Sequence, residues 1–318
     1  MKVLVTGADG FVGRFLLRRL LAEGHQVVGA VREGRPHGDA GLDEAERKAV
    51  SWAPLELDGT APMNQLVAAP VDAVVHLAAV ASSSEARRDP AWAWTVNAVG
   101  TARLLDALAR ARGEGRSDPL VLVVSSSEVY GAGEGERLRL EGDPVRPQSP
   151  YGASKAAAEI AALEAWRRTG LKVVVARAFQ HTGPGQTLTY VVPALAQRIR
   201  DARRTGQRSV TTGNLEPVRD IADVRDVVAA YVALLGSAVP GEIYNVCRGE
   251  GHRLADIFAR LAALIGASVV PEPDPALLRA GDIPHLVGDP GRLRAATGWT
   301  PAHTFDQTLQ DVVDAQAD

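Results

Sequence analysis

The fold is decided near the start of the chain by the run Val3-Leu4-Val5-Thr6-Gly7-Ala8-Asp9-Gly10-Phe11-Val12-Gly13. A short aliphatic run is followed by glycines at every third position and then by an amphipathic stretch, Phe11–Glu23. This order predicts a strand over Lys2–Thr6, a tight turn and a helix. Gly7 permits the turn, Gly10 allows a ligand close to the backbone, and Gly13 allows close packing of the helix on the strand.

A helix that starts directly after such a turn presents free N–H groups and the positive end of its dipole. The glycines therefore predict a dinucleotide whose pyrophosphate lies at the start of this helix. Their spacing is G-x-x-G-x-x-G rather than the usual G-x-G-x-x-G. The alternative interpretation is a glycine-rich turn that holds no ligand.

Strand-like and helix-like segments alternate through the first half of the chain, which predicts an α/β fold with a parallel sheet. The strands are nearly continuous aliphatic runs, so we expect both faces of the sheet to be covered. Beyond the first strand and helix, the predicted elements are the strands Gln26–Val31, Asp72–Leu77, Leu120–Ser125 and Lys172–Ala176 and the helices Trp92–Arg112 and Tyr151–Thr169.

Proline and glycine become frequent after Phe179, which predicts a smaller and less regular lobe. We expect Val224–Leu235 to return and pack on the first domain. The predicted domains are a dinucleotide-binding domain at 1–177, to which 218–246 return, and a ligand-binding lobe at 178–217 and 247–318. Ligands of open α/β sheets bind at the carboxyl ends of the strands, so we expect the site there, facing the second lobe.

The composition excludes several classes of protein. Of 318 residues, 46% are hydrophobic and 23% charged, and the net charge is −3, so nothing attracts nucleic acid or an anionic membrane as a whole. The single cysteine, Cys247, cannot form an intramolecular disulfide, which is consistent with a reducing compartment. No signal peptide and no apolar run of membrane-spanning length is recognisable. We expect a cytoplasmic protein without nucleic-acid or membrane partners and without a metal site.

The end of the second strand decides which dinucleotide is bound. An acidic residue there binds the ribose 2′-hydroxyl, whereas an arginine suits a 2′-phosphate. The strand ends Ala30-Val31-Arg32-Glu33, with Arg35 nearby, so we expect NADP(H). The open alternative is NAD(H), with Glu33 on the ribose and Arg32 in solvent. We expect Leu57-Asp58 beside the adenine; the alternative for Asp58 is an ordinary loop cap.

Tyr151 and Lys155 share a face of one predicted helix because they are four residues apart. An ammonium group and an oxidised nicotinamide favour a phenolate, so we expect the pKa of Tyr151 to lie below its usual value of about 10. The phenol can then exchange a proton with a hydroxyl or carbonyl. By itself this pair is common on solvated helix faces. Upstream, however, the strand Leu120–Ser125 runs into further serines. Ser126 is placed to hydrogen-bond the substrate oxygen. The alternative is that these serines form only a polar turn.

In this order the motifs resemble those of the extended short-chain dehydrogenases/reductases, in the branch that modifies nucleotide sugars (the NAD-dependent epimerase/dehydratase family). The resemblance covers nearly the whole chain and includes His76–Ala79, Val96–Thr101 and Ser125–Gly131. It implies a Rossmann domain with a smaller C-terminal α/β lobe, and a homodimer formed through the two long helices.

The resemblance also implies residue roles. Ser126, Tyr151 and Lys155 match the family's catalytic triad, and Glu128 is a fourth candidate. The expected cofactor-binding residues are Gly7, Gly10, Phe11, Val12, Gly13, Arg32, Leu57, Asp58, Leu77, Ala78, Ala79, Asn97, Tyr151 and Lys155.

The C-terminal half narrows the branch. Arg177–Gln186, Gly213–Asp220 and Leu278–Pro284 resemble motifs of reductases that act on GDP-6-deoxy-4-keto-D-mannose, although Gln180 replaces asparagine and Ala280 replaces proline. A diphosphate needs cations, and arginines such as Arg219 and Arg279 supply planar, bidentate donors; the alternative is surface ion pairing. The expected substrate-binding residues are Ser83, Gln180, Asn214, Arg219, Arg279 and Asp282.

Glu128 leaves the reaction open. In related 4,6-dehydratases a glutamate at this place removes the C5 proton, but some reductases carry an acidic residue here too. We expect an NADPH-dependent 4-ketoreductase that forms GDP-D-rhamnose. The alternative is a nucleotide-sugar 4,6-dehydratase or epimerase that recycles its own NAD(P). A non-catalytic dinucleotide sensor is a third hypothesis, disfavoured because Tyr151 and Lys155 are both present.

Overall fold

The computed structural model describes residues 1–32, 41–59, 61–133, 135–277 and 282–316. Its central sheet has seven parallel strands in the order β3-β2-β1-β4-β5-β6-β11, which is the doubly wound Rossmann order. Their bounds are β1 Lys2–Thr6, β2 Gln26–Val31, β3 Val50–Pro54, β4 Ala73–His76, β5 Leu120–Ser126, β6 Lys172–Ala178 and β11 Ile243–Val246. The predicted fold class is confirmed.

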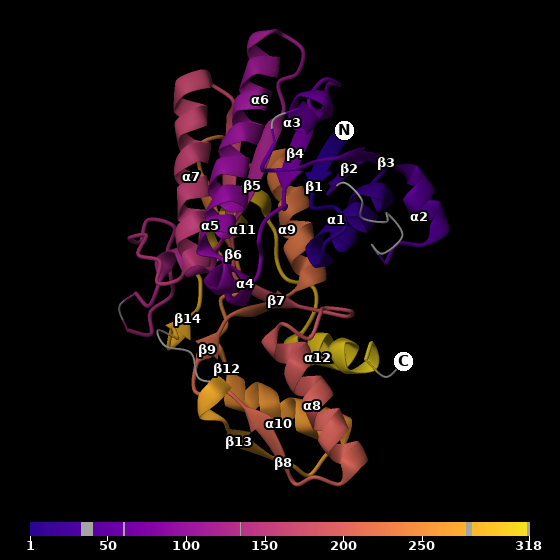
Figure 1. The fold of residues 1–318 in the computed structure, drawn as a ribbon, viewed down its shortest axis with the longest axis vertical. Coiled ribbons are helices and arrows are strands. Elements are labelled where there is room, and N and C mark those ends of the chain that lie inside the picture. The colour runs from indigo at the N-terminus through magenta and orange to yellow at the C-terminus, as the bar shows by residue number, and fades with distance from the viewer. Residues whose placement is uncertain (33–40, 60, 134, 278–281, 317–318) are drawn as a thin grey trace.

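Successive side chains of each strand point to opposite faces of the sheet. In β1, Val3 and Val5 pack with the helices of one face, and Leu4 packs with those of the other. Figure 1 shows both layers of helices. The first layer contains α1 (Phe11–Ala22), α9 (Val224–Ser237) and α11 (Gly291–Thr297), and the second contains α3 (Ala61–Leu66), α6 (Thr101–Gly113) and α7 (Pro150–Thr169). Helix α9, which contains Val224–Leu235, packs against α1 in the first layer.

The predicted helix Trp92–Arg112 is interrupted. It consists of α5 (Pro90–Trp94), a turn of π-helix over Thr95–Gly100, and α6. The side chain of Asn97 leaves this π-turn to bond neighbouring segments, as described below, and such turns occur frequently at functional sites. Strand β3 was not predicted at all, because its five residues include Ser51 and a terminal Pro54 and give no clear aliphatic run.

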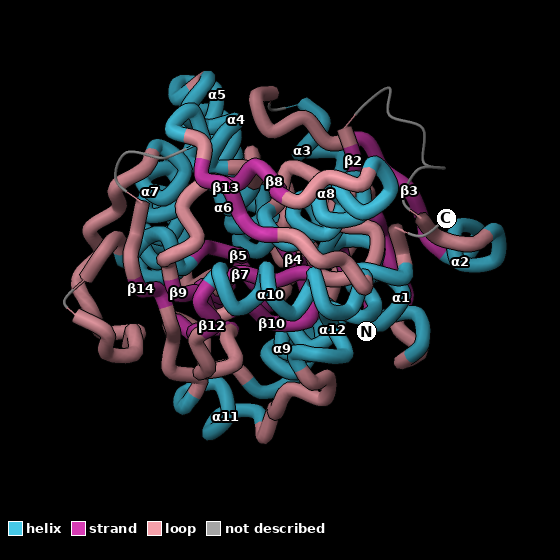
Figure 2. The backbone as a smooth tube through the Cα atoms, turned by 90° about the horizontal axis from the view of Figure 1, so that it is seen from below, coloured by secondary structure: helices cyan, strands magenta, loops and turns pink. Residues whose placement is uncertain are grey.

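The smaller lobe lies at the carboxyl ends of the sheet strands (Figures 1 and 2). Its core joins α8 (Val191–Thr205), α10 (Leu254–Ile265) and α12 (Phe305–Asp314). Three small sheets accompany these helices. They are β7 (Gln180–Thr182) with β10 (Ile221–Asp223); β8 (Ser209–Thr212) with β13 (Val270–Pro273); and β9 (Val218–Arg219) between β12 (His252–Arg253) and β14 (His285–Leu286).

The other short helices of the described residues are α2 (Glu44–Ala49), α4 (Ser83–Arg88) and 3-10 turns over Ser127–Tyr130 and Pro275–Leu277. Among the described residues, no helix is both long and apolar enough to span a bilayer.

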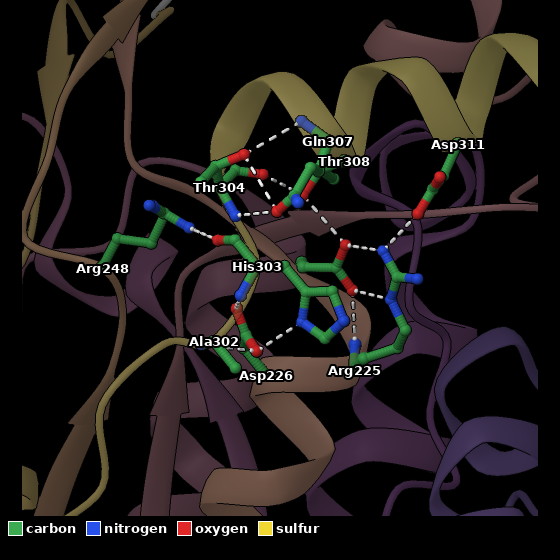
Figure 3. Close-up of polar contacts among 10 residues, drawn as sticks. Arg225, Asp226, Arg248, Ala302, His303, Thr304, Gln307, Thr308 and Asp311 are labelled. Atoms are coloured by element: carbon green, nitrogen blue, oxygen red, sulfur yellow. Dashed lines mark hydrogen bonds and ion pairs between the residues drawn. The ribbon is translucent and has the colours of Figure 1, made fainter.

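A polar cluster joins the lobe to the start of α9 (Figure 3). The buried carboxylate of Asp226 accepts hydrogen bonds from the backbone of Ala302 and His303, and lies 2.8 Å from His303 Nδ1. Arg225 bridges Asp223 and Asp311. These contacts fix α12 against the first domain, so the lobe is held firmly beside the strand ends.

Candidate active site

A cavity of about 450 Å³ lies at the carboxyl ends of the sheet strands, and we call it the main cavity. It brings together most of the predicted site residues. Those that line it are Gly7, Gly10, Phe11, Val12, Gly13, Arg32, Leu57, Asp58, Leu77, Ala78, Ala79, Ser83, Ser126, Glu128, Tyr151, Lys155 and Gln180.

The glycine turn fits a pyrophosphate. Gly7 has a φ of +67°, which side chains rarely adopt. A Cβ on Gly13 would lie 2.4 Å from the carbonyl oxygen of Gly7, so only glycine lets α1 approach β1 this closely. Gly10 precedes α1 and gives it no side-chain cap. The first N–H groups of α1 therefore remain available to an anion in the main cavity.

At the adenosine end, Arg32 is exposed and lines the main cavity. Among the described residues that line this cavity it is the only arginine, and it lies at the end of β2, where a 2′-phosphate is predicted. The competing candidate Glu33, and Arg35, lie outside the described residues. Leu57 and Asp58 line the same cavity, as a wall for an adenine would require.

A buried hydrogen-bond chain fixes the wall formed by Leu77–Ala79. His76 Nδ1 lies 2.7 Å from Thr6 Oγ1, and its Nε2 lies 3.0 Å from Thr101 Oγ1. The amide of Ala78 donates to Thr6 Oγ1. Burial, together with the charge of Lys155, lowers the pKa of His76 to about 3. The imidazole is therefore neutral at physiological pH and acts as a structural link between β1, β4 and α6.

Asn97 is predicted to bind the cofactor. It is buried and is not among the described residues that line the main cavity. Its side-chain oxygen accepts from the amide of Val80, and its nitrogen donates to the Val80 carbonyl and to Ser154 Oγ. The amide thus ties the loop after β4 to the helix that carries Tyr151, and its hydrogen-bonding capacity is largely used within the protein.

The phenol of Tyr151 stands in the first turn of α7. Ser149 caps this helix by accepting from the amide of Gly152, and Pro150 occupies its first position. Ser126, at the end of β5, makes a side-chain hydrogen bond with Tyr151. The structure therefore places the predicted serine, tyrosine and lysine together, because the end of strand β5 and the start of helix α7 meet at the same edge of the sheet.

The expected low pKa of Tyr151 is wrong for the protein alone. Burial raises its pKa well above the usual value, and the Glu128 carboxylate raises it further; the hydrogen bond with Ser126 opposes this only in part. The phenol is therefore protonated at neutral pH. Burial also lowers the pKa of Lys155 to about 8, against the opposing effect of Glu159. The ammonium group still carries its charge near neutrality.

Glu128 is held by two serines. Ser83 Oγ donates to one carboxylate oxygen at 2.5 Å, and Ser149 Oγ donates to the other at 2.7 Å. The carboxylate thereby links α4, the 3-10 turn after β5 and the start of α7. It lies beside Tyr151 in the wall of the main cavity, where it either orients these elements or acts on a substrate.

A second cavity of about 260 Å³ adjoins the main one. The two share Ser83, Glu128 and Gln180, and the second is further lined by Asn214, Arg219 and Asp282. Arg219 is buried, and its guanidinium donates to Asp282 at 2.9 Å. Five of the six predicted substrate residues are thus gathered around this cavity, whereas Arg279 lies outside the described residues.

Sequence reasoning missed Tyr190, which lines both cavities. Burial raises its pKa. It lies between β7 and α8 in a loop without a recognisable motif, so nothing in the local sequence pointed to it. The capping role of Ser149 could be recognised from the sequence, since Ser149-Pro150 is a typical helix start. Its hydrogen bond to Glu128, however, depends on the fold.

The class of protein follows from three features taken together. They are a doubly wound sheet with a glycine turn, the serine, tyrosine and lysine gathered at the strand ends, and the adjoining polar cavity. The class is that of the extended short-chain dehydrogenases/reductases, NAD(P)-dependent enzymes that act on nucleotide sugars.

Comparison with known proteins gives the family. A family model described as GDP-mannose 4,6 dehydratase matches residues 4–312, and the chain belongs to this family. A GDP-6-deoxy-D-mannose reductase of Pseudomonas aeruginosa is 33% identical, over 98% of this chain and 96% of the relative. A UDP-glucose 4-epimerase of Mycolicibacterium smegmatis is also 33% identical, over 99% of this chain and 98% of the relative.

Solved structures agree with the fold. The structure of RMD from Pseudomonas aeruginosa complexed with NADPH has a TM-score of 0.81 and 31% identity, and the match covers 99% of this chain and 98% of that one. A UDP-glucose 4-epimerase of Thermus thermophilus in complex with NAD has a TM-score of 0.85 and 30% identity, and this match also covers 99% of this chain and 98% of that one. Both nicotinamide cofactors thus occur among its relatives.

Proposed function

We propose that this protein catalyses the NADPH-dependent reduction of the C4 keto group of a GDP-4-keto-6-deoxy-hexose, which yields GDP-D-rhamnose. The observation that carries the proposal is the position of a protonated Tyr151 beside the side chains shared by the main and second cavities. A sugar bound across the two cavities would bring its ring carbonyl to this phenol. The similarity to a GDP-6-deoxy-D-mannose reductase and to an NADPH complex supports the proposal.

The chemistry divides between cofactor and protein. A bound NADPH would supply the hydride for the sugar C4. Ser126 donates a hydrogen bond to the keto oxygen, and Tyr151 gives its proton to the alkoxide that forms. Tyr151 is protonated at neutral pH, so it starts as the acid that this direction of the reaction requires. Lys155 is charged near neutrality and stabilises the tyrosinate that remains.

The residues present fit the cofactor. The free N–H groups at the start of α1, in the turn formed by Gly7, Gly10 and Gly13, would hold the pyrophosphate. Arg32 would bind the 2′-phosphate, and Leu57-Asp58 would contact the adenine. The alternative is NAD(H), for which Arg32 would have no phosphate partner.

Titration of the wild type and of Arg32→Ser with NADPH and with NADH separates the two cofactors. If Arg32 contacts the 2′-phosphate, the substitution weakens NADPH binding and leaves NADH binding unchanged.

Arg219, in the wall of the second cavity, would bind the diphosphate, and Arg279 remains the second diphosphate ligand predicted from the sequence. Asn214, Gln180, Ser83 and Asp282 would surround the base and the sugar. Asp282 holds the Arg219 guanidinium in place, so the donors that would face the phosphates are already oriented. Preorganised donors of this kind increase affinity, because less side-chain freedom is lost on binding.

The decisive experiment mixes the purified protein with NADPH and GDP-4-keto-6-deoxymannose and follows NADPH absorbance. We expect stoichiometric oxidation of NADPH and formation of GDP-D-rhamnose, identified by nuclear magnetic resonance. Absence of oxidation with both NADPH and NADH contradicts the proposal.

A second candidate is a nucleotide-sugar 4,6-dehydratase or epimerase, and the position of Glu128 in the cavity wall favours it. It predicts turnover of a GDP- or UDP-hexose without added reductant. Glu128→Gln distinguishes the candidates. In a 4,6-dehydratase the substitution removes the base that takes the C5 proton and abolishes turnover, whereas a reductase that uses Glu128 only to orient Ser83 and Ser149 would retain much of its activity.

We also propose a cytoplasmic homodimer formed through α5, α6 and α7. On these helices and the intervening π-turn, Trp94, Val99 and Ile160 are large apolar residues with exposed side chains, and Ile160 is 70% exposed. Light scattering should give twice the mass of the 318-residue chain. For Ile160→Lys it should give the mass of a single chain. Val239→Lys is the matched control, because Val239 is 57% exposed but follows α9.

A further inference from the structure

Two segments that are distant in sequence meet at the rim of the main cavity. One is the first turn of α1, where the dinucleotide pyrophosphate is expected. The other is the loop Gly183–Gln186, which follows β7 at the entrance to the smaller lobe. Phe11 from α1, and His181, Thr182 and Gln186 from the β7 segment, line the same cavity. Gln186 thus brings the end of the loop to the wall of the main cavity.

The loop has a fixed internal conformation. Thr182 Oγ1 donates to Gln186 Oε1 at 2.8 Å, and Gln186 Nε2 donates to the carbonyl of His181 at 3.1 Å. Gly185 has a φ of +72°, where other residues are strained. These bonds tie the loop to His181 and Thr182, so a contact to the loop also restrains the end of β7.

Helix α1 supplies such a contact through Arg14. Its Nη2 donates to the carbonyl oxygen of Pro184 at 2.7 Å. The guanidinium lies over the rings of Phe11 and Phe15, at 5.1 and 5.2 Å from their centroids, and Phe11 is stacked parallel to His181 at 6.4 Å. A charge-assisted hydrogen bond and cation–π contacts thus connect the cofactor helix to the loop.

The packing around this contact is close. A Cβ on Gly185 would lie 2.6 Å from Arg14 Nη2, and one on Gly183 would lie 2.7 Å from a methyl carbon of Val224. Arg14 itself does not line the main cavity. It is therefore placed to act on a substrate through the loop, and not by direct contact with a cofactor.

We infer that Arg14 is a positioning residue that couples dinucleotide binding at the start of α1 to the placement of the Gly183–Gln186 loop against the substrate. This inference rests on the proposed function, since it assigns the main cavity to a dinucleotide. An anion at the N-terminus of α1 fixes the first turn of the helix, and Arg14 and Phe11 carry that restraint to Pro184 and His181. Coupling of this kind is reciprocal, so a ligand on the loop also tightens dinucleotide binding.

The test is hydrogen–deuterium exchange with and without saturating NADPH, which needs no knowledge of the sugar. In the wild type, NADPH should slow exchange both in the first turn of α1 and in the amides of residues 183–190. Arg14→Met keeps an apolar stem over the two phenylalanines but removes the hydrogen bond to Pro184. It should reduce the NADPH-dependent protection of the loop about tenfold, the effect of losing one charge-assisted hydrogen bond, while protection of α1 remains.

Arg19→Met is the matched control, because Arg19 lies on the same helix and pairs with the exposed Glu23; it should behave as wild type. Arg14→Lys, which retains a donor, should restore part of the loop protection. It is the variant to compare with wild type if Arg14→Met does not fold. Loop protection in Arg14→Met equal to that in wild type overturns the inference. So does a loss of NADPH affinity as large as the loss of loop protection, because Arg14 would then be a cofactor ligand.

The same variants separate this inference from the proposed function. With the GDP-4-keto sugar and saturating NADPH, Arg14→Met should raise the KM for the sugar, while the Kd for NADPH measured without the sugar changes less than about threefold. If the wild type binds NADPH and shows the coupled protection but does not reduce this sugar, the substrate is wrong and the role of Arg14 stands. If neither NADPH nor NADH binds, both fail.

Discussion

The seven-stranded sheet and the smaller lobe each supply one side of the crevice, and they hold their site residues by different means. On the sheet side, Ser126 ends a strand that pairs with neighbours on both edges, and Tyr151 stands on a twenty-residue helix packed against that strand. On the lobe side, Arg219 lies in a two-residue strand and Asn214 in a loop. The strand of Arg219 pairs with only two residues on each side, and the Arg219 guanidinium donates to the Val218 carbonyl and to Asp282.

This difference has a functional consequence. Backbone pairing fixes the position of a catalytic group whatever the side chains nearby, so the sheet side can specify one chemistry. An ion pair between two side chains can be rebuilt by single substitutions, so the lobe side can change its ligand without changing the fold. The relatives illustrate the point, since reductases and epimerases share this architecture.

The largest expected effect is on the sheet side, at the phenol. Tyr151→Phe removes the proton donor without changing the packing, and we expect kcat to fall about 10²- to 10⁴-fold, the usual contribution of a general acid. NADPH affinity should change little in titrations. Tyr244→Phe is the control, because the Tyr244 hydroxyl accepts from the amide of Val239 and lines neither cavity. Equal losses of activity in both variants would contradict the assignment.

Much of the sheet side could be predicted from the sequence. Strands β1 and β2 lie where the aliphatic runs placed them, and the glycines at 7, 10 and 13 form the expected turn. These features are local, since a glycine's freedom and a strand's alternation depend on nearby residues alone. The pKa of Tyr151 could not be predicted in the same way, because its sign depends on burial and on Glu128, which only the fold brings beside it.

The second largest effect is also on the sheet side and concerns backbone approach. Gly13→Ala would place a Cβ 2.4 Å from the Gly7 carbonyl oxygen. We expect a loss of about 3 kcal/mol in the free energy of unfolding, at the upper end for overpacking, and severely weakened NADPH binding. Chemical denaturation and titration measure the two. Gly113→Ala, at the end of α6, is the control: its Cβ meets nothing within 4 Å, so stability should hold or rise slightly.

On the lobe side a smaller and more selective effect is expected. Arg219→Met should raise the KM for the nucleotide sugar about tenfold or more, since it removes a charged donor and leaves Asp282 unpaired, while NADPH affinity stays the same. Arg253→Met is the control, because Arg253 lies in the neighbouring strand β12 and pairs with the exposed Glu216. A comparable rise in that variant would indicate a general distortion of the lobe.

The lobe was predicted less completely for a physical reason. Its strands have two to four residues, too few for an alternating pattern to show. The motif around Arg219 identified the residue, but neither its pairing with Asp282 nor the cavity shared with Ser83 and Glu128 follows from local sequence. Tyr190 carries no motif and emerged only from its place between the two cavities.

The smallest expected effect compares one histidine from each side as the pH falls. The pKa of His76 is about 3 in the folded protein, so the unfolded chain binds the extra proton below about pH 6.5. Stability is then lost as the pH falls from 6.5 toward 3, and His76 should contribute about 1 kcal/mol of loss at pH 5.5. His285, on the lobe, is only partly buried, and its pKa is lowered mainly by that partial burial. Urea unfolding at pH 7.5 and 5.5 should therefore show that His76→Asn reduces the acid sensitivity more than His285→Asn does. An equal reduction in both variants would mean that the sheet side is no more tightly built than the lobe.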